Sequence, residues 1–167
     1  SLYRVLDKEN EDEGKNSLLS DKLTLSLAIN GQPTAQAFAN GQSFYLHSTV
    51  NPEREASLLA DSLKMTEDYI VFGMGLGYHV LELLNRYRSA RVHIFENNIY
   101  LLYMAFTYID WTTYIASGRI LVVYNDDPKQ LISELGNQFA EMKKAELLVH
   151  YPAIKMIEDA QTRQLLE

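Results

Sequence analysis

The sequence contains no cysteine and only four histidines among its 167 residues. Without cysteine the chain has no disulfide, no thiolate nucleophile and no cysteine-ligated zinc site. The histidines stand far apart in the sequence and lack a metal-ligand spacing, so the sequence predicts no metal site. These histidines are His47, His79, His93 and His150. A reducing, cytoplasmic location fits a chain without cysteine.

Basic residues are also scarce. The 15 Lys and Arg residues are outnumbered by 22 Asp and Glu residues, which gives a net charge of −7. Nucleic acids and anionic membranes bind basic patches, so neither is expected as a partner. No apolar run reaches the roughly 20 residues that a membrane-spanning helix needs. The chain also lacks the G-x-x-x-x-G-K-[ST] loop of classical NTPases.

Four stretches of different character divide the chain. Residues 1–21 are polar and rich in carboxylates, which predicts a flexible acidic segment. In residues 22–50, apolar residues alternate with polar ones and two Asn-Gly pairs predict hairpin turns, so a small β-meander is expected. Residues 51–150 have the pattern of an α/β domain. Residues 151–167 are expected to start a helix that leads to a further, C-terminal domain.

The α/β region alternates between strand patterns and amphipathic helix patterns. Strands are predicted at residues 69–72, 91–96, 119–124 and 146–151. Asn51 and Asp127 are each followed by proline and are predicted to cap helices. Short apolar strands that alternate with helices indicate a sheet covered on both faces. The sequence therefore predicts a doubly wound, mostly parallel, Rossmann-like (methyltransferase-like) sheet, preceded by the β-meander.

The most informative stretch is YIVFGMGLGYHVLELL, residues 69–84, in which a strand meets three glycines and then a helix. Ligands of parallel sheets bind at the carboxyl ends of the strands, where a helix N-terminus presents free N–H groups. The candidate ligand-binding residues of this turn are Gly73, Gly75, Gly77, Tyr78 and His79. The alternative is that the glycines only allow the strand and the helix to pack tightly.

His79 falls in the first turn of the predicted helix, where the helix dipole disfavours its charged form. We expect it to be neutral and partly exposed, and a role as a base or polar contact is the alternative.

Two acidic residues at the ends of the following strands complete the candidate site. Glu96 ends the second strand. Its separation from Gly77 along the sequence is one at which an acid commonly binds ribose hydroxyls. The alternative is a solvated residue at a strand end. Asp126 follows the third strand, whereas its neighbour Asp127 has the capping role. These residues leave the ligand unidentified, and a nucleotide or nucleotide-sugar would fit them.

The spacing of the glycines narrows the range of ligands that the turn could bind. A dinucleotide fingerprint of the form G-x-G-x-x-G is absent, because Tyr78 takes the third glycine position counted from Gly73. The observed G-x-G-x-G spacing resembles the first motif of class I methyltransferases, which use S-adenosylmethionine. That family has an acid where Val71 stands, so S-adenosylmethionine is the less favoured ligand.

Three segments in order resemble the N-terminal region of the motility accessory factor (Maf) family of bacterial glycosyltransferases. They are YLHSTVNPEREASLLADSL, VFGMGLGYHVLELL and HIFENNIYLLYMAF, within residues 45–109. The matching features are Ser48 before the helix start at Asn51–Ala56, the glycine turn Gly73–His79, and Glu96 after the next strand.

The resemblance implies a motility-associated parent protein that transfers nonulosonic acids, such as pseudaminic or legionaminic acid, from CMP-activated donors to Ser or Thr of flagellin. The transferase centre is expected in a later domain of the same chain. The present chain would then be a non-catalytic accessory domain, with that glycosyltransferase domain and flagellin as partners. The alternatives are an S-adenosylmethionine-dependent methyltransferase-like domain and a purely structural interaction module, which the aromatic segment at residues 100–114 favours.

Overall fold

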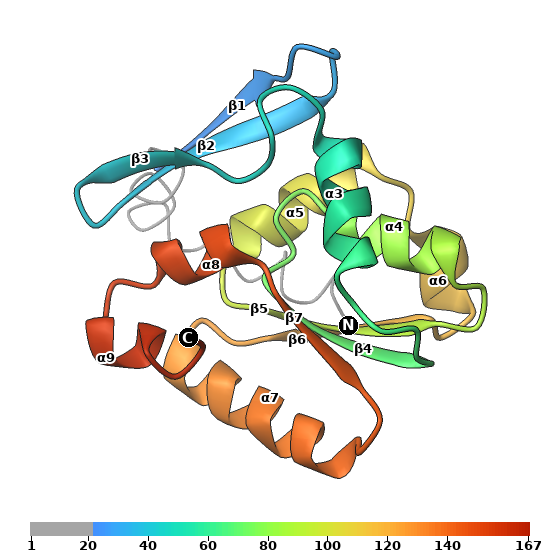
Figure 1. Ribbon diagram of the computed structural model, residues 1–167. Helices are drawn as coiled ribbons and strands as arrows, with labels where there is room; N and C mark the ends of the chain where they lie inside the picture. Colours follow the sequence, from blue (N-terminus) through green and yellow to red (C-terminus); the bar gives the residue numbers. More distant parts are fainter. Residues whose placement is uncertain (1–21) are drawn as a thin grey trace.

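The computed structural model describes residues 22–167, so the predicted acidic segment 1–21 lies outside the described residues. The described part contains a three-stranded sheet of order β1-β2-β3 and a four-stranded sheet of order β6-β5-β4-β7 (Figure 1). All pairs in the first sheet are antiparallel and all pairs in the second are parallel. The predicted Rossmann-like α/β fold, preceded by a β-meander, is confirmed.

The β-meander consists of β1 (Leu23–Leu27), β2 (Pro33–Ala39) and β3 (Gln42–Tyr45). The turn between β2 and β3 is the second Asn-Gly pair, in which Asn40 and Gly41 have φ of 51° and 75°. Two successive positive φ values match the right-handed twist of the flanking strands, which is why Asn-Gly favours a tight hairpin here.

The parallel sheet consists of β4 (Asp68–Phe72), β5 (Arg91–Glu96), β6 (Ile120–Tyr124) and β7 (Glu146–Val149). From β4 the chain steps through β5 to β6 on one side, and then returns to pair β7 on the other side of β4. The strand order therefore reverses between β4 and β7. This switch point is where doubly wound sheets leave a crevice for ligands.

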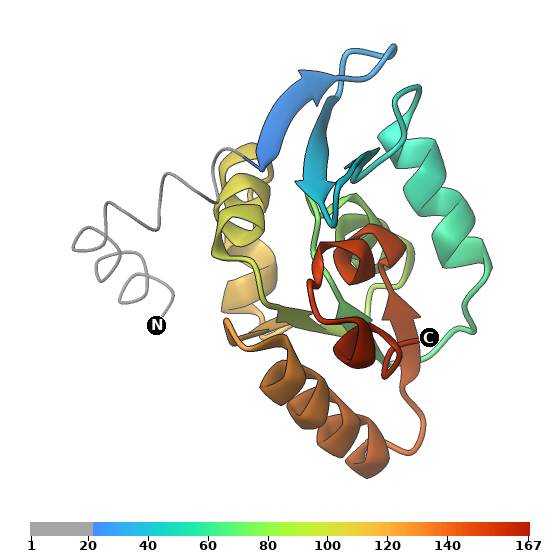
Figure 2. The same ribbon diagram turned by 90° about the vertical axis from the view of Figure 1, so that its left-hand side faces the viewer.

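Helices cover both faces of the parallel sheet (Figures 1 and 2). The described residues form α3 (Pro52–Asp61), α4 (Tyr78–Arg86), α5 (Ile99–Tyr108), α6 (Thr112–Ala116), α7 (Pro128–Glu141), α8 (Tyr151–Met156) and α9 (Ala160–Arg163). On β4, Tyr69 and Val71 pack with α3, α4 and α5, whereas Ile70 and Phe72 pack with α7 and α8. Strand β4 is thus buried on both faces, as its continuous apolar run requires.

The β-meander packs over the carboxyl end of β4. A third buried cluster joins Ala35 and Ala37 of β2 to Leu76 and Tyr78, which follow β4, and to Leu101 of α5. The two sheets therefore share a core, and the turn after β4 is the place where they meet.

The predicted helix caps are confirmed. The Asn51 side chain accepts a hydrogen bond from the Arg54 N–H group at 2.9 Å. The Asp127 side chain accepts hydrogen bonds from the N–H groups of Lys129 and Gln130 at the start of α7. In both helices the carboxyl or amide oxygen satisfies backbone donors that would otherwise lack a partner.

Residues 151–167, in which the sequence predicts the start of a helix, contain the two short helices α8 and α9. Within residues 22–167, no helix combines the length and the apolar character needed to cross a membrane.

Asp127→Ala should lower the free energy of unfolding by about 1 kcal/mol, because α7 loses its N-cap. Urea denaturation followed by circular dichroism measures this change. The matched control is Asp126→Ala, which removes an exposed neighbouring carboxylate and should leave the midpoint unchanged. Equal destabilisation by the two substitutions would contradict the capping role.

Candidate functional site

The glycine turn after β4 is enclosed by the protein. All ten residues from Val71 to Val80 are buried. Gly73, Gly75 and Gly77 have φ of 87°, 51° and 92°, a region that strains any residue with a Cβ atom. The glycines therefore produce the sharp strand-to-helix turn that the sequence predicts, but the turn does not face an open cleft.

Each glycine of the turn also leaves room for a neighbouring side chain. A Cβ atom on Gly75 would lie 2.5 Å from Nε2 of His47. A Cβ atom on Gly77 would lie 2.5 Å from Cζ2 of Trp111, and one on Gly73 would overlap the Cβ atom of Ala153. This geometry supports the tight-packing interpretation of the glycines. Their role in ligand binding stays a prediction.

Tyr78 joins the turn to the β-meander. Its hydroxyl donates a hydrogen bond to the Pro33 carbonyl oxygen at 2.7 Å, across the interface between α4 and β2. Burial, with a smaller contribution from the charge of Glu53, raises the pKa of Tyr78 to about 12. The side chain therefore stays a neutral donor at physiological pH. Its hydrogen bond to Pro33 holds β2 of the β-meander against the turn.

Glu96 lies beneath the turn and is only 1% exposed. Its Oε2 atom accepts a hydrogen bond from the Met74 N–H group at 2.7 Å, and its Oε1 atom accepts one from the Asn98 N–H group at 2.8 Å. Burial raises the pKa of Glu96 to about 7, against the lowering effect of these backbone donors. Both oxygens thus hold the turn against the start of α5, and the ribose-binding role stays a prediction.

Asp126 lies apart from the other candidate residues. It is exposed and lines a hollow of about 410 Å³ together with Asn97 and Asn98. No residue of the turn Gly73–His79 lines this hollow. The structure therefore brings together the glycines, Tyr78, His79 and Glu96, whereas Asp126 lies apart from them.

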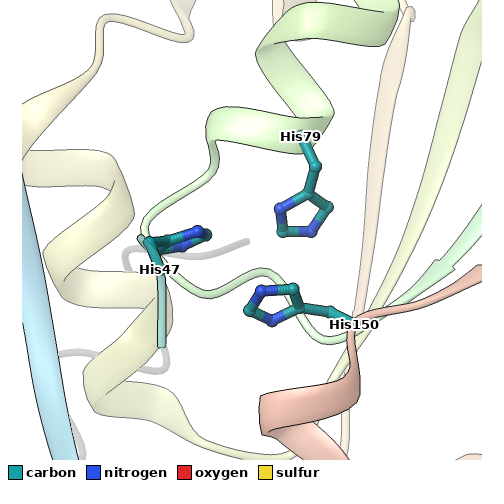
Figure 3. Close-up of side chains that lie close together, drawn as sticks. All are labelled: His47, His79 and His150. Atoms are coloured by element: carbon teal, nitrogen blue, oxygen red, sulfur yellow. The ribbon is translucent and has the colours of Figure 1, made fainter. Parts of the chain in front are cut away.

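Three histidines converge on the glycine turn (Figure 3). His47 follows β3, His79 is the second residue of α4, and His150 follows β7. Each offers a ring nitrogen, and these nitrogens all lie within 4.8 Å of one another. The ring of His150 is stacked against the rings of both His47 and His79, with centroids 4.9 Å and 4.5 Å away. The sequence shows no spacing that links these residues.

Burial disfavours the charged forms of His79 and His150. His47, His79 and His150 are at most 4% exposed, so the prediction of a partly exposed His79 is wrong. Desolvation, with a smaller electrostatic contribution from His47, lowers the pKa of His79 to about 3. Desolvation and the two neighbouring histidines also hold the pKa of His150 well below its ordinary value.

The hydrogen bonds of the cluster leave two nitrogens without a partner. His47 places Nδ1 3.2 Å from Oε1 of Glu55, and its Nε2 atom accepts a hydrogen bond from the Leu76 N–H group at 2.9 Å. Nε2 of His79 lies 2.9 Å from the Gly73 carbonyl oxygen. Within residues 22–167, the Nδ1 atoms of His79 and His150 are buried and have no hydrogen-bond partner. Neutral imidazole nitrogens of this kind can accept a hydrogen bond or bind a metal ion.

His93 stays outside this cluster. It is buried in β5, with Nε2 3.1 Å from Asp68 Oδ1 and Nδ1 2.7 Å from Gln138 Nε2. The alternation of His93 with apolar neighbours predicts a hydrogen-bonded core residue, and the structure confirms it.

Comparisons with known proteins point to one family. A family model described as "Glycosyltransferase Maf N-terminal domain" matches residues 6–154. A solved structure of a Maf glycosyltransferase from Magnetospirillum magneticum AMB-1 has a similar fold, with a TM-score of 0.59 and 14% sequence identity. The alignment covers 87% of this chain and 29% of that one. No curated protein matches the sequence.

Gly75→Ala should destabilise the protein more strongly than Gly118→Ala. Both glycines have positive φ, but a Cβ atom on Gly118 would meet nothing within 4 Å. We expect a loss of about 1–2 kcal/mol at Gly118 from backbone strain alone, and a further 1–3 kcal/mol or so at Gly75 from the contact with His47. Chemical denaturation of the two variants checks this. Equal losses would mean that His47 does not constrain the turn.

His79→Gln should remove a loss of stability that His79 causes in the wild-type protein as the pH falls. The folded-state pKa of His79 is lowered from 6.5 to about 3, so the unfolded chain binds a proton that the folded chain refuses as the pH falls below 6.5. Between pH 7 and pH 4.5 this costs the wild-type protein about 2 kcal/mol. Glu96 titrates in both proteins, so its opposite effect cancels in the difference. Urea denaturation of both proteins at the two pH values measures this difference. An equal change in the free energy of unfolding of the two proteins would contradict the lowered pKa of His79.

Proposed function

Because the chain belongs to the family of glycosyltransferase Maf N-terminal domains, we propose that it is a non-catalytic accessory domain of a flagellin-modifying glycosyltransferase. The parent protein would transfer a nonulosonic acid, such as pseudaminic or legionaminic acid, from a CMP-activated donor to Ser or Thr of flagellin in the cytoplasm. The match to the family model over residues 6–154 supports this proposal.

The observation that carries the accessory role is the enclosed glycine turn. In a nucleotide-binding Rossmann-like domain, the first glycine turn approaches the ligand with its backbone, and the acid after the second strand binds the ribose. Here His47 and Trp111 occupy the space next to Gly75 and Gly77, and backbone N–H groups occupy both oxygens of Glu96. The groups that would bind a nucleotide are therefore used to hold the domain together.

The share of the solved Maf glycosyltransferase that this chain covers supports a transferase centre elsewhere in the parent protein. The chain spans 29% of the length of the solved Maf glycosyltransferase that it resembles in fold. We place the binding of the CMP-activated donor in a C-terminal domain of the parent protein, which leaves this domain to support that centre or to bind the acceptor.

The alternative of an S-adenosylmethionine-dependent domain has less support. Val71 stands where class I methyltransferases have an acid, and it is fully buried in the sheet. Glu96, the remaining acid of such a site, accepts hydrogen bonds from the N–H groups of Met74 in the turn and Asn98 at the start of α5.

Calorimetric titration of this chain with CMP, a CMP-activated nonulosonic acid and S-adenosylmethionine tests the proposal. We expect no binding of any of the three, because the turn and Glu96 are occupied. The parent protein, with its C-terminal domain, should bind the CMP-activated sugar and transfer it.

Two results would contradict the accessory role. One is transfer or donor hydrolysis by this chain alone. The other is micromolar binding of S-adenosylmethionine that Glu96→Ala abolishes, since that result would establish the methyltransferase-like alternative.

A further inference from the structure

We propose that His47, His79 and His150 form a binding site for one divalent transition-metal ion of the Zn²⁺ type. The three side chains come from three separate segments of the chain and point toward one another (Figure 3). Their ring nitrogens lie within 4.8 Å of one another in a buried position. This inference goes beyond the accessory role and does not depend on it.

The cluster lies where the fold would bind a ligand. The strand order reverses between β4 and β7, and the residues that follow these two strands are Gly73 and His150. Their backbones continue the ladder, since the His150 N–H group donates to the Phe72 carbonyl oxygen at 2.8 Å. The histidines therefore occupy the crevice at the switch point, which in related architectures receives a nucleotide.

The unpartnered nitrogens of the cluster indicate a ligand. Nδ1 of His79 and Nδ1 of His150 are buried without a hydrogen-bond partner among the described residues. Buried polar atoms of folded proteins nearly always have a partner, and exceptions call for a bound water, an ion or a functional role. The three imidazoles, each with one ring nitrogen within 4.8 Å of the others, match the ligand set of a metal ion.

The other ring nitrogens are held as they are in metal sites. A histidine that binds a metal usually donates its second ring N–H to a carboxylate or to a backbone carbonyl oxygen, which fixes the tautomer. His47 has Glu55 in this position, and His79 has the Gly73 carbonyl oxygen. His150 forms a hydrogen bond with the backbone of Leu46. His79 thus has one anchored nitrogen and one without a partner, and His47 has one nitrogen beside a carboxylate and one that accepts from a backbone N–H group.

The chemistry of the donors selects the metal. Imidazole nitrogens suit Zn²⁺, Cu²⁺, Ni²⁺ and Fe²⁺, whereas Mg²⁺ and Ca²⁺ require oxygen ligands. Zn–N bonds of about 2.0–2.1 Å in a tetrahedral site place the nitrogens about 3.4 Å apart. The cluster would therefore contract by at most about 1.4 Å, and His47 Nε2 would exchange its bond with the Leu76 N–H group for the ion.

Access to the cluster is available from the surface. His47 and His150 line a hollow of about 550 Å³, which Glu55 and Tyr151 also border. Three protein ligands leave a fourth position for water, as in open zinc sites. Bound metal would connect the segment after β3 to the parallel sheet, and so stabilise the position of the β-meander.

The test is a titration of metal-free protein with Co²⁺ and Zn²⁺. We expect one ion per chain, Co²⁺ absorption bands of tetrahedral intensity that Zn²⁺ abolishes, and no competition by Mg²⁺. At a free Zn²⁺ concentration about 100 times the Kd, Tm should rise by about 5–10 °C.

Variants locate the site. His79→Gln and His150→Gln should abolish the Co²⁺ bands, and Glu55→Gln should weaken binding about 10–100-fold through His47. Glu55→Gln keeps the proposal testable if the histidine variants do not fold, since Glu55 is half-buried at the rim of the hollow. The matched control is His93→Gln, which removes a buried histidine outside the cluster and should leave the metal affinity unchanged.

Three results would overturn the proposal. The first is the absence of stoichiometric binding, which is expected if a buried water donates to both unpartnered nitrogens instead. The second is metal binding that His79→Gln, His150→Gln and Glu55→Gln leave intact. The third is an equal loss in His93→Gln, which would point to a general effect on folding.

Discussion

The close approach of backbone and side chains at the turn after β4 is the constraint on which the rest of the structure depends. Gly75 has no Cβ atom, so the ring of His47 can reach the turn, and Gly77 leaves room in the same way for Trp111. These contacts let His47, which follows β3, and Trp111, which precedes α6, pack against the turn. A side chain at either position would combine backbone strain with overlap in a fully buried place.

The same close packing explains why the crevice that binds ligands in folds of this class is filled here by contacts within the protein. Tyr78 fastens the meander to the turn through Pro33, and Glu96 holds the turn from below through backbone N–H groups. Residues that could contact a nucleotide therefore have structural partners. Of the cluster's ring nitrogens, Nδ1 of His79 and Nδ1 of His150 have no hydrogen-bond partner within residues 22–167, and they point to a small ion in place of a large ligand.

Local features of the fold could be predicted because they depend on a few neighbouring residues. The bounds of β5, the caps at Asn51 and Asp127, and the Asn40-Gly41 hairpin all follow from short-range rules. The histidine cluster depends instead on how the meander docks, and no periodicity connects His47 with His150. The predicted strand was too long: β7 ends at Val149, not at residue 151, so His150 lies at the same sheet edge as Gly73. The rule that ligands gather at strand ends would then have included it.

The central claim is that histidines, and not a nucleotide, occupy the switch point between β4 and β7. Crystals of this chain grown with both Zn²⁺ and CMP would test it most directly, by anomalous diffraction at the zinc absorption edge. The account predicts one anomalous peak between His47, His79 and His150, with Tyr78 still bonded to Pro33 and no nucleotide at the glycine turn. A nucleotide lying against Gly75 with Glu96 on its ribose, or the absence of an anomalous peak between the histidines, would contradict it.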